Sequence, residues 1–112
     1  MAAKTFTIKA GDRFPALATQ LLDMDGNPIN LELYSTAKIV IAPCVAGRRI
    51  VDMKTATMSA LRTDGKIAYI WGEGETDKPG EYLLEVVLTT LTGVEQTVPG
   101  GWYDKVVILP RL

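Results

Sequence analysis

The sequence has 112 residues, of which 47% are hydrophobic and 22% charged, and 12 basic and 13 acidic side chains give it a net charge of −1. Such a length suits one domain, and such a composition excludes a wholly disordered chain. The balanced charge excludes the basic excess with which proteins neutralise nucleic-acid phosphates. We therefore expect a single domain over residues 1–112 that binds no nucleic acid.

Cysteine usage and the first residues bear on where the protein is made. Cys44 is the only cysteine, so no disulfide can form within the chain. Residues 1–5 lack the apolar region of a signal peptide, and the longest apolar runs are too short to cross a bilayer. We expect synthesis in a cytoplasm and no membrane association. Cys44 itself follows Pro43 at the end of an apolar run, where a structural thiol is expected rather than a nucleophile.

Short β-strand patterns, separated by turn residues, follow one another along the chain. In the first half they cover residues 5–9, 17–22 and 37–42, with weaker candidates at 50–53 and 57–62. In the second half they cover residues 66–71, 81–91, 95–98 and 104–109. Helices at 17–22 and 53–61 are the alternative, but neither segment has a sustained helical period with caps. The pattern predicts an all-β fold, an immunoglobulin-like antiparallel β-sandwich of about seven to eight short strands.

The strand predicted over residues 81–91 is apolar on both faces. One face carries Tyr82, Leu84, Val86 and Leu88, and the other carries Leu83, Val87 and Leu91, interrupted by Glu85 and Thr89. The outer face of a small sandwich is normally polar. Leu83, Glu85 and Val87 are therefore candidates for an interface that another subunit covers, and a bulged central strand is the alternative explanation.

Candidate catalytic and metal-binding groups are few. The sequence has no histidine, which removes the commonest general base and every Ser-His or Cys-His nucleophile pair. Asp23, Asp25 and Asn27 surround Gly26 as in a calcium loop, but Tyr34 occupies the position of the closing glutamate, so a tight turn is expected. We expect no catalytic residue, metal or cofactor, and hence not an enzyme.

Other exposed positions are candidates for contacts. Arg48 and Arg49 are predicted at a hairpin tip that docks on an acidic neighbour or is simply solvated. Trp71 has the spacing of a core residue, whereas Trp102 and Tyr103, at a loop–strand boundary, are candidates for stacking on carbohydrate. The two ends of the chain, with Arg111 near the second, are candidates for docking arms.

The order of the turn and strand segments resembles a known family. The segments that carry the resemblance are IKAGD at 8–12, DGNPINL at 25–31, GKIAYIW at 65–71, ETDKPGEYLLEV at 75–86, GVEQTVP at 93–99 and WYDKVVI at 102–108. Together they resemble the N-terminal immunoglobulin-like domain of tailed-phage baseplate upper proteins, a domain that also occurs in phage tail, neck and head accessory proteins.

This resemblance implies a structural virion protein of a tailed bacteriophage. Family members often continue into a coiled coil or receptor-binding region, which this sequence lacks, so the resemblance implies an accessory subunit of the head, neck, tail or baseplate. Its expected partners are other phage structural proteins and copies of itself in a homo-oligomer, and its expected location is the virion after assembly in the host cytoplasm. A carbohydrate- or host-receptor-binding module is the alternative.

Overall fold

The computed structural model describes residues 4–45, 47–99 and 103–112, and within them the chain is almost entirely β-structure. The strands are β1 (Lys4–Lys9), β2 (Leu17–Gln20), β3 (Tyr34–Pro43), β4 (Val51–Met58), β5 (Lys66–Tyr69), β6 (Gly80–Thr90), β7 (Glu95–Pro99) and β8 (Tyr103–Leu109). Two single-turn 3-10 helices, η1 (Leu31–Leu33) and η2 (Arg62–Asp64), lie in connections. In this described part no helix has the length and apolar character needed to span a membrane. The all-β prediction is confirmed.

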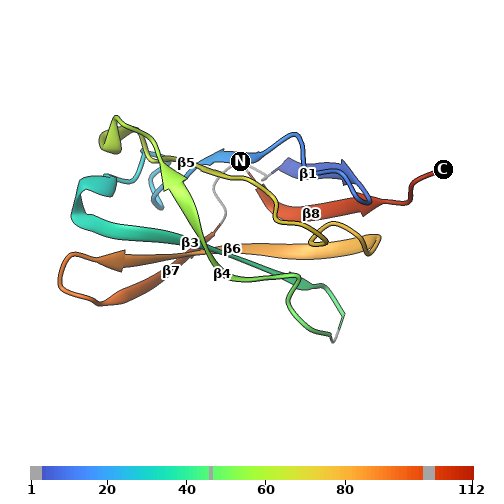
Figure 1. The fold of residues 1–112 in the computed structure, drawn as a ribbon. Helices are drawn as coiled ribbons and strands as arrows, with labels where there is room; N and C mark the ends of the chain where they lie inside the picture. The colour runs from blue at the N-terminus through green and yellow to red at the C-terminus, as the bar shows by residue number, and fades with distance from the viewer. Residues whose placement is uncertain (1–3, 46, 100–102) are drawn as a thin grey trace.

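The strands form two layers that share one strand (Figure 1). One layer has the order β1-β8-β6-β3-β4, and β7 pairs with β6 beyond the end of β8. The other layer is formed by β2 and β5 with the last residues of β4, which pairs with β3 along most of its length and with β5 at its end. The order β8-β6-β3 against β5-β2 is that of an immunoglobulin-like sandwich. Because β4 belongs to both layers, the sheet is nearly closed.

Two details differ from the sequence-based expectation. The sandwich is antiparallel except at one edge, where β1 pairs with β8 in parallel. The weak strand candidate at 50–53 and the first two residues of the candidate at 57–62 belong to one strand, β4, which continues through Lys54, Thr55 and the buried Ala56. The prediction of a strand over residues 59–62 is wrong, because β4 ends at Met58 and Arg62 begins η2. Met53 has a φ of +53°, and the pairing register with β3 shifts between Ile39 and Ile41. This irregularity lies in the part of β4 that pairs with β3, and it breaks the alternation that marks a strand in the sequence. The change to pairing with β5 comes after Ala56.

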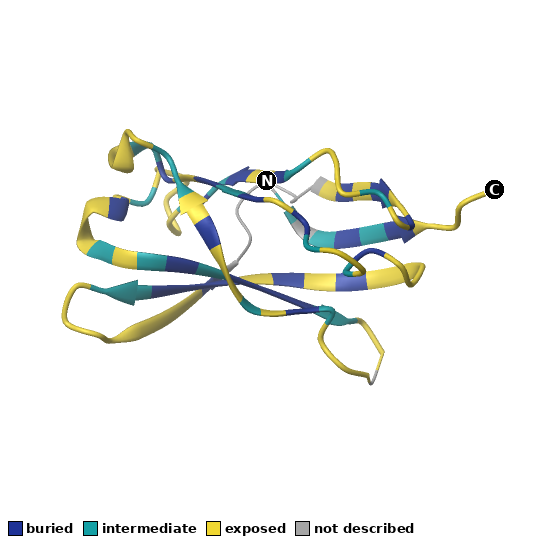
Figure 2. Ribbon diagram, viewed as in Figure 1, coloured by how far each residue is buried: buried dark blue, intermediate teal, exposed yellow. Residues whose placement is uncertain are grey.

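The core lies between the layers and includes the predicted apolar faces (Figure 2). Every second residue of β6 from Tyr82 to Leu88 is buried, as is the set Ile67, Tyr69 and Trp71. The Trp71 ring is fully buried, and its Nε1–H donates to the Pro15 carbonyl at 3.2 Å. The core assignment of Trp71 is therefore confirmed.

Two turns fix the loops at opposite ends of the sandwich. Asp23 Oδ1 accepts the backbone N–H groups of Asp25 and Asn27, both at 2.9 Å, while Gly26 has a φ of +83°. The predicted tight turn at this position is confirmed. Near the other end, the Tyr82 hydroxyl donates to the Lys78 carbonyl at 2.7 Å. A tyrosine at the start of a strand that bonds to backbone a few residues upstream is a tyrosine corner, a feature of immunoglobulin-like folds.

Candidate interaction surfaces

A groove of about 410 Å³ lies between the β3–β4 connection and the start of β6. We call it the basic groove; it is lined by Pro43, Val45, Gly47, Arg48, Arg49, Ile50, Lys78, Pro79, Gly80, Glu81 and Tyr82. The two segments meet because β3 and β6 pair up to their ends, where Pro43 lies opposite Tyr82. The predicted hairpin tip at Arg48 and Arg49 is thus one wall of a hollow.

Two cations of the basic groove are available to a ligand. Arg49 pairs with Asp52 at 2.8 Å, and the groove's carboxylate, Glu81, pairs with Lys105 at 3.0 Å. Within the described part of the chain, neither Arg48 nor Lys78 pairs with a carboxylate. Since the acidic group is already neutralised, the groove attracts negative charge.

The buried Tyr82 side chain and its hydrogen bond hold part of the lining of the basic groove in place. The Tyr82 ring is buried, its hydroxyl holds the Lys78 carbonyl, and burial raises the pKa of this hydroxyl above the ordinary tyrosine value. Pro79 lies between Lys78 and Tyr82 in the sequence, and its ring fixes the backbone φ at that position. A preformed hollow binds with less loss of conformational entropy than a loop that must be ordered first.

The opposite end of the sandwich has a different character. There η1, the 22–30 connection, η2 and the tip of the β6–β7 hairpin lie together, and Leu91 N–H donates to the Leu33 carbonyl at 3.4 Å (Figure 1). Leu33, Leu91 and Val94 are between 61% and 71% exposed, and Met24 is fully exposed. We call this surface the loop end. These exposed apolar side chains make the loop end a candidate contact surface.

The loop end is also acidic. Its carboxylates are those of Asp23, Asp25, Glu32, Asp64 and Glu95, and its cations are those of Arg62 and Lys66. The Asp64 carboxylate has a structural role, because it accepts hydrogen bonds from the Ser59 hydroxyl and the Lys66 backbone N–H. Asp25, Glu32 and Glu95 are exposed side chains on the outer surface of the loops. The loop end therefore differs in charge from the lining of the basic groove.

The outer face of β6 contains the predicted Leu83, Glu85 and Val87 interface. Leu83 is 50% exposed and Glu85 is exposed, but Val87 is only 9% exposed within the single chain. By register, Lys38 of β3 and Thr97 of β7 flank Val87, and a lysine stem can cover such a position. Of the three candidates, Leu83 offers the most apolar surface to a partner.

Other predicted contact residues are engaged within the chain or lie outside the described residues. Arg111 donates to the Ala10 carbonyl at 3.1 Å and to Asp12 Oδ1 at 2.6 Å, which holds the C-terminal segment against the β1–β2 turn. The half-buried Tyr103 ring packs edge-on against Phe6, with the ring centres 5.4 Å apart. Trp102, like residues 1–3 of the predicted N-terminal arm, lies outside the described residues.

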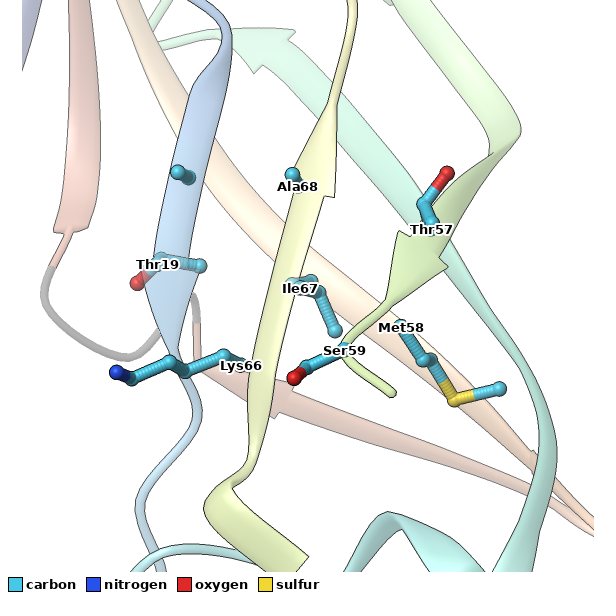
Figure 3. A pocket seen from close by; sticks show the side chains of 8 residues that line it. Thr19, Thr57, Met58, Ser59, Lys66, Ile67 and Ala68 are labelled. Atoms are coloured by element: carbon cyan, nitrogen blue, oxygen red, sulfur yellow. The ribbon is translucent and has the colours of Figure 1, made fainter. Parts of the chain in front are cut away.

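A second hollow, of about 360 Å³, lies over β2, β5 and the end of β4 (Figure 3). Small side chains form part of its lining, and among them Ala18, Ala68 and Thr57 lie side by side in register. Lys66 is its ionisable lining group. The hollow has no convergent set of acid, base and nucleophile, which a catalytic pocket requires. Nor do the described residues of the chain contain a group of three or more His, Cys, Asp or Glu side chains arranged to hold a metal.

Comparisons with known proteins found no family model, no curated protein and no solved structure that matches this chain. The functional argument therefore depends on the residues and their geometry.

Sequence reasoning found one wall of the basic groove and missed the other. Lys78, Pro79 and Tyr82 are far from Arg48 in sequence and come next to it only through the β3–β6 pairing. It also missed the loop end, although the apolar Leu91 and Val94 on either side of a Thr-Gly turn are a visible signal. Apolar residues at a hairpin tip, where polar residues are usual, point to a contact surface.

Proposed function

We propose that this chain is a structural subunit of a tailed-bacteriophage particle and acts by protein–protein assembly rather than by catalysis. The observation that carries the proposal is the placement of two contact surfaces of opposite character at the two ends of a small sandwich. A subunit that links neighbours needs two such surfaces, whereas an enzyme needs one pocket with converging reactive groups.

The phage setting is supported by the resemblance of the sequence to the immunoglobulin-like domain of baseplate upper proteins, which covers most of the chain. The sandwich suits a rigid building block, since β3 and β6 extend from one end of it to the other. Contacts repeated by symmetry give an assembly strong avidity even when each one is weak. We infer an accessory position in the head, neck, tail or baseplate.

Quantitative mass spectrometry of gradient-purified particles tests this proposal. The chain is expected to co-purify with the major structural proteins at a fixed ratio to them. A non-virion protein encoded by the same phage is the matched control for contamination. Recovery of the chain at no more than the level of that control would contradict the proposal.

A further inference from the structure

We propose that copies of this chain associate head to tail, with the loop end of one copy seated on the basic groove of the next. This inference rests on the proposed function as an assembly subunit and names one of its partners, a second copy. It follows from the chemistry of the two surfaces and from their separation along the molecule.

The two surfaces are complementary in charge and in apolar character. The basic groove offers Arg48 and Lys78, which pair with no carboxylate among the described residues, beside the apolar Val45 and Pro79. The loop end offers exposed apolar side chains beside exposed carboxylates, including those of Glu32 and Glu95. An apolar and acidic surface is complementary to an apolar and basic hollow, because opposite charges attract across the contact. Two acidic surfaces would repel each other, so the loop end is less suited to contact its own copy.

The tip of the β6–β7 hairpin is the part of the loop end best suited to enter the groove. Two hydrogen bonds hold its backbone. Thr90 N–H donates to the Val94 carbonyl at 2.8 Å, and Val94 N–H donates to Thr90 Oγ1 at 3.0 Å. It therefore presents Leu91 and Val94 on a preformed turn. The groove volume of about 410 Å³ is within the range in which protein pockets hold ligands.

Within one copy, the loop end and the basic groove are too far apart to contact each other. Gly80, the first residue of β6, lines the groove, and Thr90, its last residue, is at the hairpin tip. The molecule is 43 Å long, and the two surfaces lie at its opposite ends (Figure 1). A contact between unlike surfaces on different copies is heterologous, so repetition produces a ring or a filament rather than a closed two-fold dimer.

Disulfide trapping tests the proposed contact, because Cys44 is exposed and lies between two groove residues, Pro43 and Val45. A Thr92→Cys variant places a second thiol on the hairpin tip. Under mild oxidation we expect a ladder of dimers, trimers and longer species, since each copy carries one thiol at each end. The matched control is Thr57→Cys, an exposed position on another part of the sandwich. No ladder, or an equal ladder from the control, overturns the proposal.

Charge reversal provides an independent measurement by sedimentation velocity over a range of protein concentrations. Arg48→Glu/Lys78→Glu and Glu32→Lys/Glu95→Lys are each expected to weaken self-association by roughly tenfold or more. An equimolar mixture of the two is expected to recover it, because each reversed surface meets an opposite charge. Lys9→Glu/Lys54→Glu, outside both surfaces, is expected to leave association unchanged. Failure of the mixture to associate, or equal weakening by the control, overturns the proposal.

These outcomes are distinct from those that test the proposed function. A wild-type chain that stays monomeric at every concentration overturns head-to-tail association and leaves a role in the particle open to other partners. A chain that forms the ladder but is absent from purified particles overturns the role in the particle and retains the self-association.

Discussion

At the scale of single residues, Gly65 shows how one backbone conformation joins several parts of the fold. Its φ is +69°, and its carbonyl accepts the Leu21 N–H at 2.8 Å. A Cβ at this position would lie 2.7 Å from the Leu21 carbonyl oxygen and 3.1 Å from the Ile29 nitrogen. The close approach of two backbone segments therefore requires glycine.

We expect Gly65→Ala to lower the free energy of unfolding by more than about 2 kcal/mol, because it adds a steric overlap to a positive φ. Gly26→Ala is the matched control, since Gly26 has a φ of +83° and no atom within 4 Å of a Cβ. It should cost about 1 kcal/mol. Urea unfolding measures both values, and equal costs would show that the close approach is not present.

Tyr69 is a second residue whose environment has a measurable consequence. Its ring is buried and its hydroxyl donates to Glu75 Oε1 at 2.6 Å. Burial, followed by the bond to the Glu75 carboxylate, raises the pKa of this hydroxyl well above its ordinary value. An unfolded tyrosine loses its proton near pH 10. Above that pH the unfolded chain binds fewer protons than the folded one, so stability falls as pH rises.

The expected outcome is a lower urea midpoint at about pH 11 than at about pH 9, with a smaller fall for Tyr69→Phe than for the wild type. The variant removes the group that titrates differently in the two states. Tyr34→Phe is the control for the removal of a tyrosine hydroxyl, because the Tyr34 hydroxyl donates to Gln96 on the surface. A Tyr69→Phe protein whose midpoint falls as steeply as that of the wild type would contradict the assignment.

At the scale of elements, β6 was predicted to be apolar on both faces. The apolar residues of its outer face differ in how far they are exposed. Val87 is buried within the single chain and Leu83 is half exposed. We expect Val87→Lys to lower stability by about 2 kcal/mol, because it places a charge at a buried position. Leu83→Lys should change it by no more than about 0.5 kcal/mol. Chemical unfolding of the two variants measures the difference, and equal tolerance would mean that Val87 is not covered in the isolated chain.

Elements with strict alternation and clear turn residues were predictable from the sequence. The limits of β5, β6 and β8 come within about two residues of the predicted ones because the two-residue period reports burial directly. β4 was split because the irregularity at Met53 and the two consecutive exposed residues Lys54 and Thr55 interrupt that period. The parallel pairing of β1 with β8 joins opposite ends of the chain, which no local pattern encodes.

The interaction surfaces were less predictable than the strands for the same reason. Arg48 was identified because two adjacent arginines in a turn are visible in a short window. The other wall of the groove, at Lys78 and Pro79, and the contact between Leu33 and Leu91 depend on strand pairing across the whole domain. A short stretch of sequence shows whether a residue is charged or apolar, but the tertiary structure decides which residues lie together on one surface.

At the scale of the whole molecule, the sandwich places an acidic, apolar loop end and a basic groove at opposite ends of β6. The sequence alone predicted an assembly protein from a two-faced strand. The two surfaces that we propose as contacts lie at the ends of the sandwich instead, so the proposed direction of assembly is along the strands. Rigid units linked in this direction suit a ring or a filament.

The most direct test of a structural role is a cryo-electron microscopy map of the purified particle. The account predicts density for this sandwich at symmetry-repeated positions in the head, neck, tail or baseplate, with its ends in contact with neighbouring subunits. A complete map in which every density is assigned to other chains would contradict it.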